Sequence, residues 1–205
     1  QEIGVFGRRT MDKFTVDGTL GYNGYGTNFY GIPVDVNNIS LNPAREAQRF
    51  NDIYFTGEVL SNFDPNKEEA LTYSAKLDAY TFRDKFESSE NSVAISGYLN
   101  KRVKTFNVGV NAAVDVNNIG TLNASNNALK INNSIASVQP YISLKGTNYT
   151  LSVGANIVSE FGDSSRFNLF PTAEIDFSLV PSYLHLFGGL TGGVKQASYK
   201  SFANQ

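Results

Sequence analysis

The sequence contains no cysteine and a single histidine in 205 residues. Without cysteine there is neither a disulfide framework nor a thiolate metal site, and His185 has no thiol nucleophile to activate. No run approaches eighteen apolar residues, which excludes a transmembrane helix. The first residues do not form a charged and then apolar leader, so we expect any signal peptide to have been removed or to lie upstream.

The sequence also lacks an excess of either positive or negative charge. The chain has 17 basic and 19 acidic residues, a formal net charge of -2 and no basic tract, so it lacks the electrostatic footprint of a protein that binds nucleic acid or an anionic membrane surface. What is present is 41% apolar residues, of which many are aromatic. Such a composition predicts an ordered protein, and the length suits one domain, 1–205, with an ample core.

The clearest pattern is a hairpin over 136–157. If Gly146 and Thr147 form a two-residue turn, Lys145 pairs with Asn148 and the whole register follows. One face is then entirely apolar, with the pairs Leu144 and Tyr149, Ile142 and Leu151, Pro140 and Val153, Val138 and Ala155, and Ala136 and Ile157. The other face is polar and carries Ser143, Thr150, Tyr141, Ser152, Gln139, Asn156 and Ser137. A pair of strands about ten residues long with one apolar and one wet face fits a half-buried sandwich or a membrane barrel.

The same alternation recurs along the chain. It predicts further strands at 12–25, 52–61, 71–82, 91–100, 105–116, 168–180 and 183–195. In the last pair we expect Leu179 to face Leu184 and His185 to lie opposite Ser178. The total is nine or ten strands, because 25–35 can supply one more if 23–27 is a turn.

Two regularities favour a barrel in an outer membrane. The connections alternate in length, with long external loops at 26–51 and 117–133 and short turns on the other rim, as in outer-membrane barrels. Aromatic residues also lie on the apolar face close to the short-turn rim, where amphipathic rings suit the lipid headgroups. This predicted lipid-facing girdle consists of Phe14, Tyr73, Phe106, Tyr149 and Phe177.

We therefore predict an all-β fold, an antiparallel up-and-down transmembrane β-barrel. The strand count in bacterial single-chain barrels is even, and an unclosed edge in lipid leaves backbone groups unpaired, so we expect these strands to be part of a larger barrel. A soluble β-sandwich, serving as an adhesin or binding module, is the alternative, because it also has alternating strands.

The polar faces supply the candidate functional residues. We predict that the lumen is lined by Asp17, Lys76, Asp78, Lys145, Glu174, Asp176, His185 and Lys195. Glu174 and Asp176 share a face and could act as a carboxylate pair, but charges in barrel interiors commonly form structural networks. The glycines of 188–193 lack the ending of a phosphate loop. We expect no catalytic residue, no metal site and no cofactor.

Three stretches carry a family resemblance: Tyr80-Thr81-Phe82-Arg83-Asp84-Lys85-Phe86-Glu87-Ser88-Ser89-Glu90-Asn91, the segment from Tyr25 to Gly31, and Phe187-Gly188-Gly189-Leu190. Together they resemble the Bacteroidota outer-membrane β-barrel proteins that are TonB-dependent-receptor-like. The resemblance covers the barrel portion only, since no plug domain and no energy-coupling segment is found. It implies a larger barrel in the outer membrane and assigns no functional residue.

The sequence thus predicts a non-enzymatic, integral outer-membrane protein. Its expected role is porin-like solute passage or transport, or service as an accessory subunit of an envelope complex. The expected partners are outer-membrane lipid and other outer-membrane proteins or lipoproteins, without nucleic acid.

Overall fold

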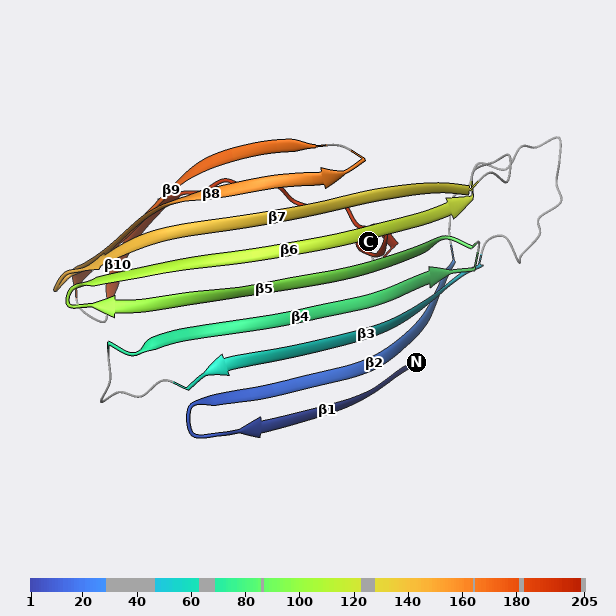
Figure 1. The fold of residues 1–205 in the computed structure, drawn as a ribbon, viewed down its shortest axis with the longest axis horizontal. Coiled ribbons are helices and arrows are strands. Elements are labelled where there is room, and N and C mark those ends of the chain that lie inside the picture. Colours follow the sequence, from blue (N-terminus) through green and yellow to red (C-terminus); the bar gives the residue numbers. More distant parts are fainter. Residues whose placement is uncertain are drawn as a thin grey trace.

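The chain folds into one antiparallel sheet of ten strands (Figure 1). The computed structural model describes residues 1–28, 47–62, 69–85, 87–122, 128–163, 165–180 and 183–203. The strands are β1 (Glu2–Thr10), β2 (Phe14–Asn28), β3 (Ala47–Ser61), β4 (Leu71–Asp84), β5 (Ser89–Val103), β6 (Phe106–Leu122), β7 (Ala128–Lys145), β8 (Tyr149–Gly162), β9 (Arg166–Val180) and β10 (Leu184–Leu190). A short helix, α2 (Tyr199–Ala203), follows them.

Each strand pairs with its neighbour in the sequence, so the order in space is β1 to β10. This confirms the predicted all-β, antiparallel, up-and-down fold. The sequence pattern did not reveal β1, in which Gly4, Gly7 and two arginines interrupt the alternation. The turn at 23–27 on which the optional strand at 25–35 depended is not formed, because β2 continues through Asn28. Residues 29–35 lie outside the described part of the chain.

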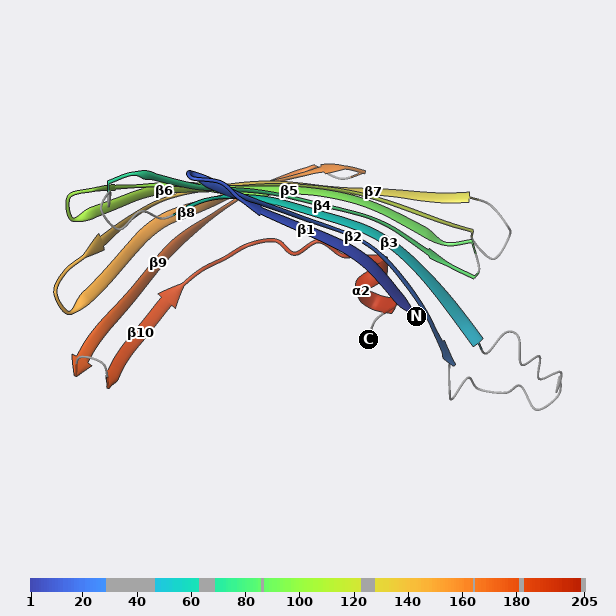
Figure 2. The same ribbon diagram turned by 90° about the horizontal axis from the view of Figure 1, so that it is seen from below.

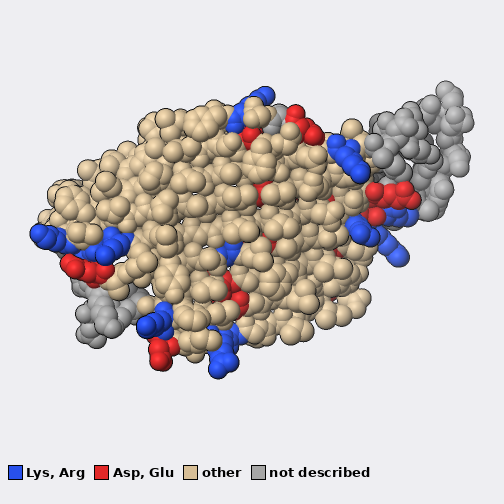
Figure 3. Space-filling model, viewed as in Figure 1, with Lys and Arg blue, Asp and Glu red and all other residues tan. Residues whose placement is uncertain are grey.

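The sheet is strongly curved (Figure 2). Its two faces differ in chemistry, as the strand registers show. The convex face carries the apolar residues of the alternation, for example the row Leu99, Val110 and Pro140, in which each residue pairs with the next. Figure 3 looks onto this face, where Lys, Arg, Asp and Glu gather mostly near the strand ends and the middle is almost free of them. Large hydrophobic side chains there, such as Ile142, are about half exposed.

The concave face carries the polar residues of the alternation and the chain's buried groups. Among the described residues, the buried hydrophobic side chains are Phe50, Phe82 and Val158, and all three belong to the concave face by register. The buried polar residues include Asp52 and Glu90. Phe82 on β4 pairs with Asp52 on β3 and with Glu90 on β5. The packed part of the molecule is therefore inside the curve.

The hairpin of β7 and β8 keeps the predicted faces in a shifted register. Leu144 pairs with Leu151 and Lys145 with Thr150, rather than with Tyr149 and Asn148, because the tight turn is centred one residue later and the Gly146 amide donates to the Tyr149 carbonyl at 2.8 Å. A shift of the partner by two residues leaves every side chain on its face. The faces were predicted correctly and the pairs were not.

Both predicted long loops are shorter than expected. Residues 117–122 and 128–133 continue β6 and β7, with Asn117 opposite Asn133 and Asn118 opposite Asn132, because a ladder needs only backbone groups and tolerates asparagine beyond the apolar band. Similarly, 26–28 belong to β2 and 47–51 to β3. The remainder of both loops lies outside the described residues.

The last predicted strand, 183–195, is also too long. His185 pairs with Ser178 as expected, but a register shift between Leu184 and His185 places Leu184 opposite Val180 instead of Leu179. The strand ends at Leu190, and Thr191–Ala203, hereafter the strap, leaves the sheet and crosses beneath its concave face to end in α2 (Figure 2).

Candidate functional site: the polar concave face

The strap is fastened to the concave face by hydrogen bonds from several strands. Asn156 on β8 donates to the Gly192 carbonyl at 3.0 Å, and Gln196 donates to the Asn133 carbonyl on β7. Beyond this point Ser198 reaches β5 and donates to Glu90 at 3.2 Å. The strap therefore bridges strands that are not neighbours in the sheet.

Glu90 is the centre of the contact between strap and sheet. Its side chain is completely buried. One carboxylate oxygen accepts hydrogen bonds from the Tyr80 hydroxyl at 3.1 Å and from the Asn117 amide. The other accepts from the Ser198 hydroxyl and from the backbone N–H of Lys200, the latter at 2.6 Å. Burying a carboxylate is costly unless its oxygens accept hydrogen bonds, and the strap supplies two of the four donors to Glu90.

Lys200 forms the second polar link. Its Nζ lies 2.6 Å from Asp52 Oδ2, and the Asp52 side chain is 6% exposed. The same ammonium lies 4.3 Å from the centre of the Tyr80 ring, within the range of a cation–π interaction. The other oxygen of Asp52, Oδ1, is buried without a hydrogen-bond partner among the described residues.

An aromatic stack seals the same region. Phe50 lies 5.1 Å from Tyr25 and 5.4 Å from Phe82, and Phe82 meets Tyr199 of the strap edge-on at 5.7 Å. The Tyr199 hydroxyl donates to Asp84 at 2.7 Å. Burial, and next the hydrogen bond to Asp84, raise the pKa of Tyr199 to about 12, so the phenol is neutral at physiological pH.

The part of the concave face near the short turns stays open. A hollow of about 530 Å³ is lined by Thr72, Tyr98, Asn100, Arg102, Asn107, Asn111, Tyr141 and Lys145, together with Ala70. A neighbouring hollow of about 260 Å³ shares Asn111 and Tyr141 with it and adds Gln139 and Glu174. Amides, hydroxyls and a few charges form a wettable surface here.

Tyr141 is held flat in this open region. A Cβ built on Gly109, its partner on β6, would lie 2.4 Å from the Tyr141 ring, so only glycine leaves room for it. The Tyr141 hydroxyl accepts a hydrogen bond from Asn100 at 2.8 Å. The ring therefore covers the backbone of β6 at Gly109 and forms part of the lining of the hollow.

The structure places the predicted lumen residues as follows. Lys76 forms an ion pair with Asp78 at 2.9 Å, and Asp78 also accepts from Thr56 at 3.0 Å. His185 Nδ1 lies 2.9 Å from Asp176 Oδ1. Glu174 and Asp176 line one hollow of about 340 Å³, and Lys145 lies at the first hollow.

The other two predicted lumen residues are Asp17 and Lys195. Asp17 pairs by register with Glu58 and with Arg8 on the unpredicted strand β1. Lys195 was expected on the last strand, which is wrong, because it lies exposed in the strap. None of the eight residues contacts Glu90 in the described part of the chain, so they do not form one site with it.

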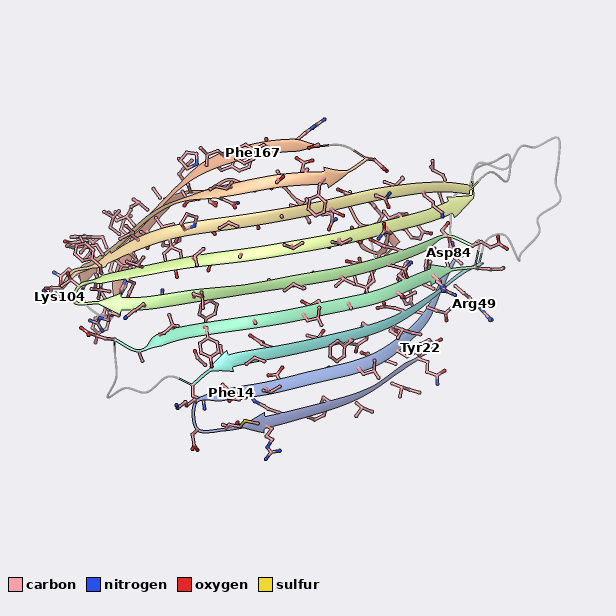
Figure 4. The ribbon with its side chains drawn as sticks, viewed as in Figure 1. Phe14, Tyr22, Arg49, Asp84, Lys104 and Phe167 are labelled. Atoms are coloured by element: carbon pink, nitrogen blue, oxygen red, sulfur yellow. The ribbon has the colours of Figure 1, made fainter. Side chains whose placement is uncertain are left out.

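The five predicted girdle residues lie on the convex face toward the short-turn end. Tyr149 pairs with Phe177, and Phe106 lies next to the turn that joins β5 and β6. Figure 4 labels Phe14 and Lys104 at this end of the sheet and Asp84 and Arg49 at the opposite end. At that opposite end, four polar residues that pair in succession, Thr81, Asn91, Asn118 and Asn132, cross the convex face.

Sequence reasoning missed the buried site, namely Asp52, Glu90, Asn117, Tyr199 and Lys200. Glu90 falls between the strands predicted at 71–82 and 91–100, and Tyr199 and Lys200 lie beyond the last predicted strand, 183–195. One signal was present: Phe50 and Phe82 occupy the polar face by alternation, and large aromatic rings on a wet face require a cover.

Among the described residues, no helix has the length and hydropathy to cross a membrane. No group of three or more histidine, cysteine, aspartate or glutamate side chains that could hold a metal ion is found in the same ranges. Comparisons with protein-family models, curated proteins and solved structures give no match.

Proposed function

We propose that this chain forms the wall of a β-barrel in a bacterial outer membrane, with the concave face lining a polar lumen through which solutes pass. The observation that carries the proposal is the direction of curvature. The strap lies inside the curve (Figure 2) and is bound there by Asn156 and Glu90, so the polar face is the inner one and the apolar face the outer one. This is the arrangement of a membrane barrel. A soluble sandwich or barrel instead encloses its apolar face.

The dimensions of the apolar face support the same proposal. On β6 it runs from Phe106 to Val116 before the polar row begins at Asn118. Antiparallel strands rise about 3.4 Å per residue, so this run measures about 34 Å along the strand. A tilt of about 40° reduces it to about 26 Å, close to the apolar band of about 25 Å in outer-membrane barrels.

Single cysteine variants test the orientation of the sheet, because the natural sequence has no cysteine. We expect an environment-sensitive dye at Val110→Cys to be quenched by nitroxide groups on lipid chains. At the adjacent Asn111→Cys, on the concave face, we expect labelling by a water-soluble maleimide and no quenching by lipid. If neither position responds to the lipid quencher, the membrane proposal fails; fractionation of cells is the simpler first check.

Passage of solutes has its own test in planar bilayers. The purified protein should conduct, and two variants should change ion selectivity in opposite directions. Lys76→Met removes the positive charge that is paired with Asp78 and should shift the reversal potential toward cation preference. Glu174→Gln removes an exposed negative charge from the same face and should shift it toward anions. Bilayers that stay silent would rule out passage.

A second candidate is an accessory subunit of an outer-membrane complex. It is supported by the edges of the described sheet, since β1 and β10 are its two ends and do not pair with each other. In lipid such edges require a partner strand, from the same protein or from another. Gentle detergent extraction should then recover stable outer-membrane proteins or lipoproteins, and a solitary monodisperse protein would contradict this candidate.

A further inference from the structure

The contact made by Lys200 has the form of a ligand in a binding site. A carboxylate oxygen of Asp52 lies 2.6 Å from the ammonium, and the face of the Tyr80 ring covers it at 4.3 Å. An anionic acceptor combined with an aromatic face is a recognised arrangement for binding an alkylammonium group.

The two residues that form the site belong to the sheet, whereas Lys200, which occupies it, belongs to the strap. Asp52 lies on β3 and Tyr80 on β4, and these adjacent strands are fixed by a continuous backbone ladder. Lys200 is brought to them by the strap, which has neither strand nor helix between Thr191 and Ser198. The geometry of the site is therefore set without Lys200, whereas the position of Lys200 depends on the strap.

Lys200 also leaves part of the site unused. It reaches Oδ2 of Asp52, while Oδ1 is buried and has no partner among the described residues. The Asp52 residue as a whole is 4% exposed, so water does not readily serve that oxygen. A free ammonium ion has three donors and, without the constraint of the strap, can approach both oxygens.

We propose that Asp52 and Tyr80 form a binding site for primary alkylammonium ions, which Lys200 occupies in cis. A ligand of this class, either a diamine or a lysine side chain, competes with Lys200 for the site. Its binding releases the Lys200 end of the strap from the concave face. The effective concentration of a tethered group reaches the millimolar range, so the native chain holds the site against dilute ligands.

The experiment is a titration of the purified full chain in detergent with 1,5-diaminopentane and, separately, with N-acetyl-lysine methylamide. Lys200→Met keeps the aliphatic stem but vacates the site, and should strengthen binding of at least one probe by tenfold or more. Asp52→Asn in the Lys200→Met background should remove that gain. The probe that binds more tightly distinguishes a small diamine from a lysine side chain in a peptide.

Lys195→Met is the matched control, because Lys195 is an exposed lysine on the same strap, and it should bind both probes as the native chain does. A folded Lys200→Met variant that binds neither probe saturably overturns the proposal, as does equal binding with and without Asp52. If Lys200→Met does not fold, the test is made on the native chain. Adding 1,5-diaminopentane should accelerate amide hydrogen exchange within 199–203, and unchanged exchange overturns the proposal. These readouts require no conductance, so they fail or succeed independently of the proposed passage of solutes.

Discussion

Replacing Val110 with arginine is expected to lower the free energy of unfolding in lipid vesicles by about 2–4 kcal/mol, the cost of arginine at the midplane on the lipid face of a barrel. Val110 lies near the middle of the apolar run on β6, between Leu99 and Pro140 on the neighbouring strands. An arginine there would have to reach past other apolar side chains to find water.

Two matched variants make this measurement specific. Asn111→Arg places the same side chain one residue away on the open concave face and should cost less than about 1 kcal/mol. Asn118→Arg lies on the convex face but in the polar row at its edge, and should cost about 0–1 kcal/mol because the penalty falls toward the interface. The chain has no tryptophan, so the folded fraction during urea titration is best followed by the gel mobility of unheated samples. Equal costs at the three positions would contradict a lipid-facing convex surface.

Local alternation was enough to predict the class of fold and the two faces of the sheet. Each strand exposes its side chains with a period of two, and a face that must be apolar fixes which residues lie on it. This is why Ile142 and Ser143 were assigned to opposite faces correctly although their partners on β8 were displaced by two residues. The register depends on the position of the turn, which Gly146 alone does not determine.

Strand ends were predicted less well, because they depend on backbone pairing rather than on side-chain polarity. The asparagines at 117–118 and 132–133 resemble a loop in composition, yet their backbones extend the ladder between β6 and β7. β1 was missed for a related reason: as an edge strand exposed along its whole length, it carries no strict apolar pattern.

The buried site could not be predicted from local pattern, since it joins residues far apart in the sequence. Lys200 meets Asp52 only because the chain turns back after Leu190 and crosses the curved sheet. No alternation encodes that return. The rings of Phe50 and Phe82 on the polar face indicate that something covers them, without indicating what.

Glu90→Ala is expected to release the strap. The substitution removes the acceptor of four donors, contributed by Tyr80, Asn117, Ser198 and the Lys200 backbone. Breaking a buried charged network by removing one partner costs about 3–5 kcal/mol. Part of that cost is avoided if the strap moves away and water reaches the groups left behind, so undocking is the expected response.

Hydrogen exchange at the Lys200 amide measures this directly, because that N–H donates to Glu90 itself. Its exchange should accelerate by at least a hundredfold in Glu90→Ala, with protease cleavage appearing within 191–198. Glu90→Gln retains one acceptor oxygen but turns an NH₂ group toward donors, and should lie between the two. Glu174→Ala, at an exposed carboxylate on the same concave face, should leave both readouts unchanged. If the strap of Glu90→Ala stays as protected as that of the native chain, Tyr199 and the aromatic stack hold it in place, and Glu90 serves only the interior of the sheet.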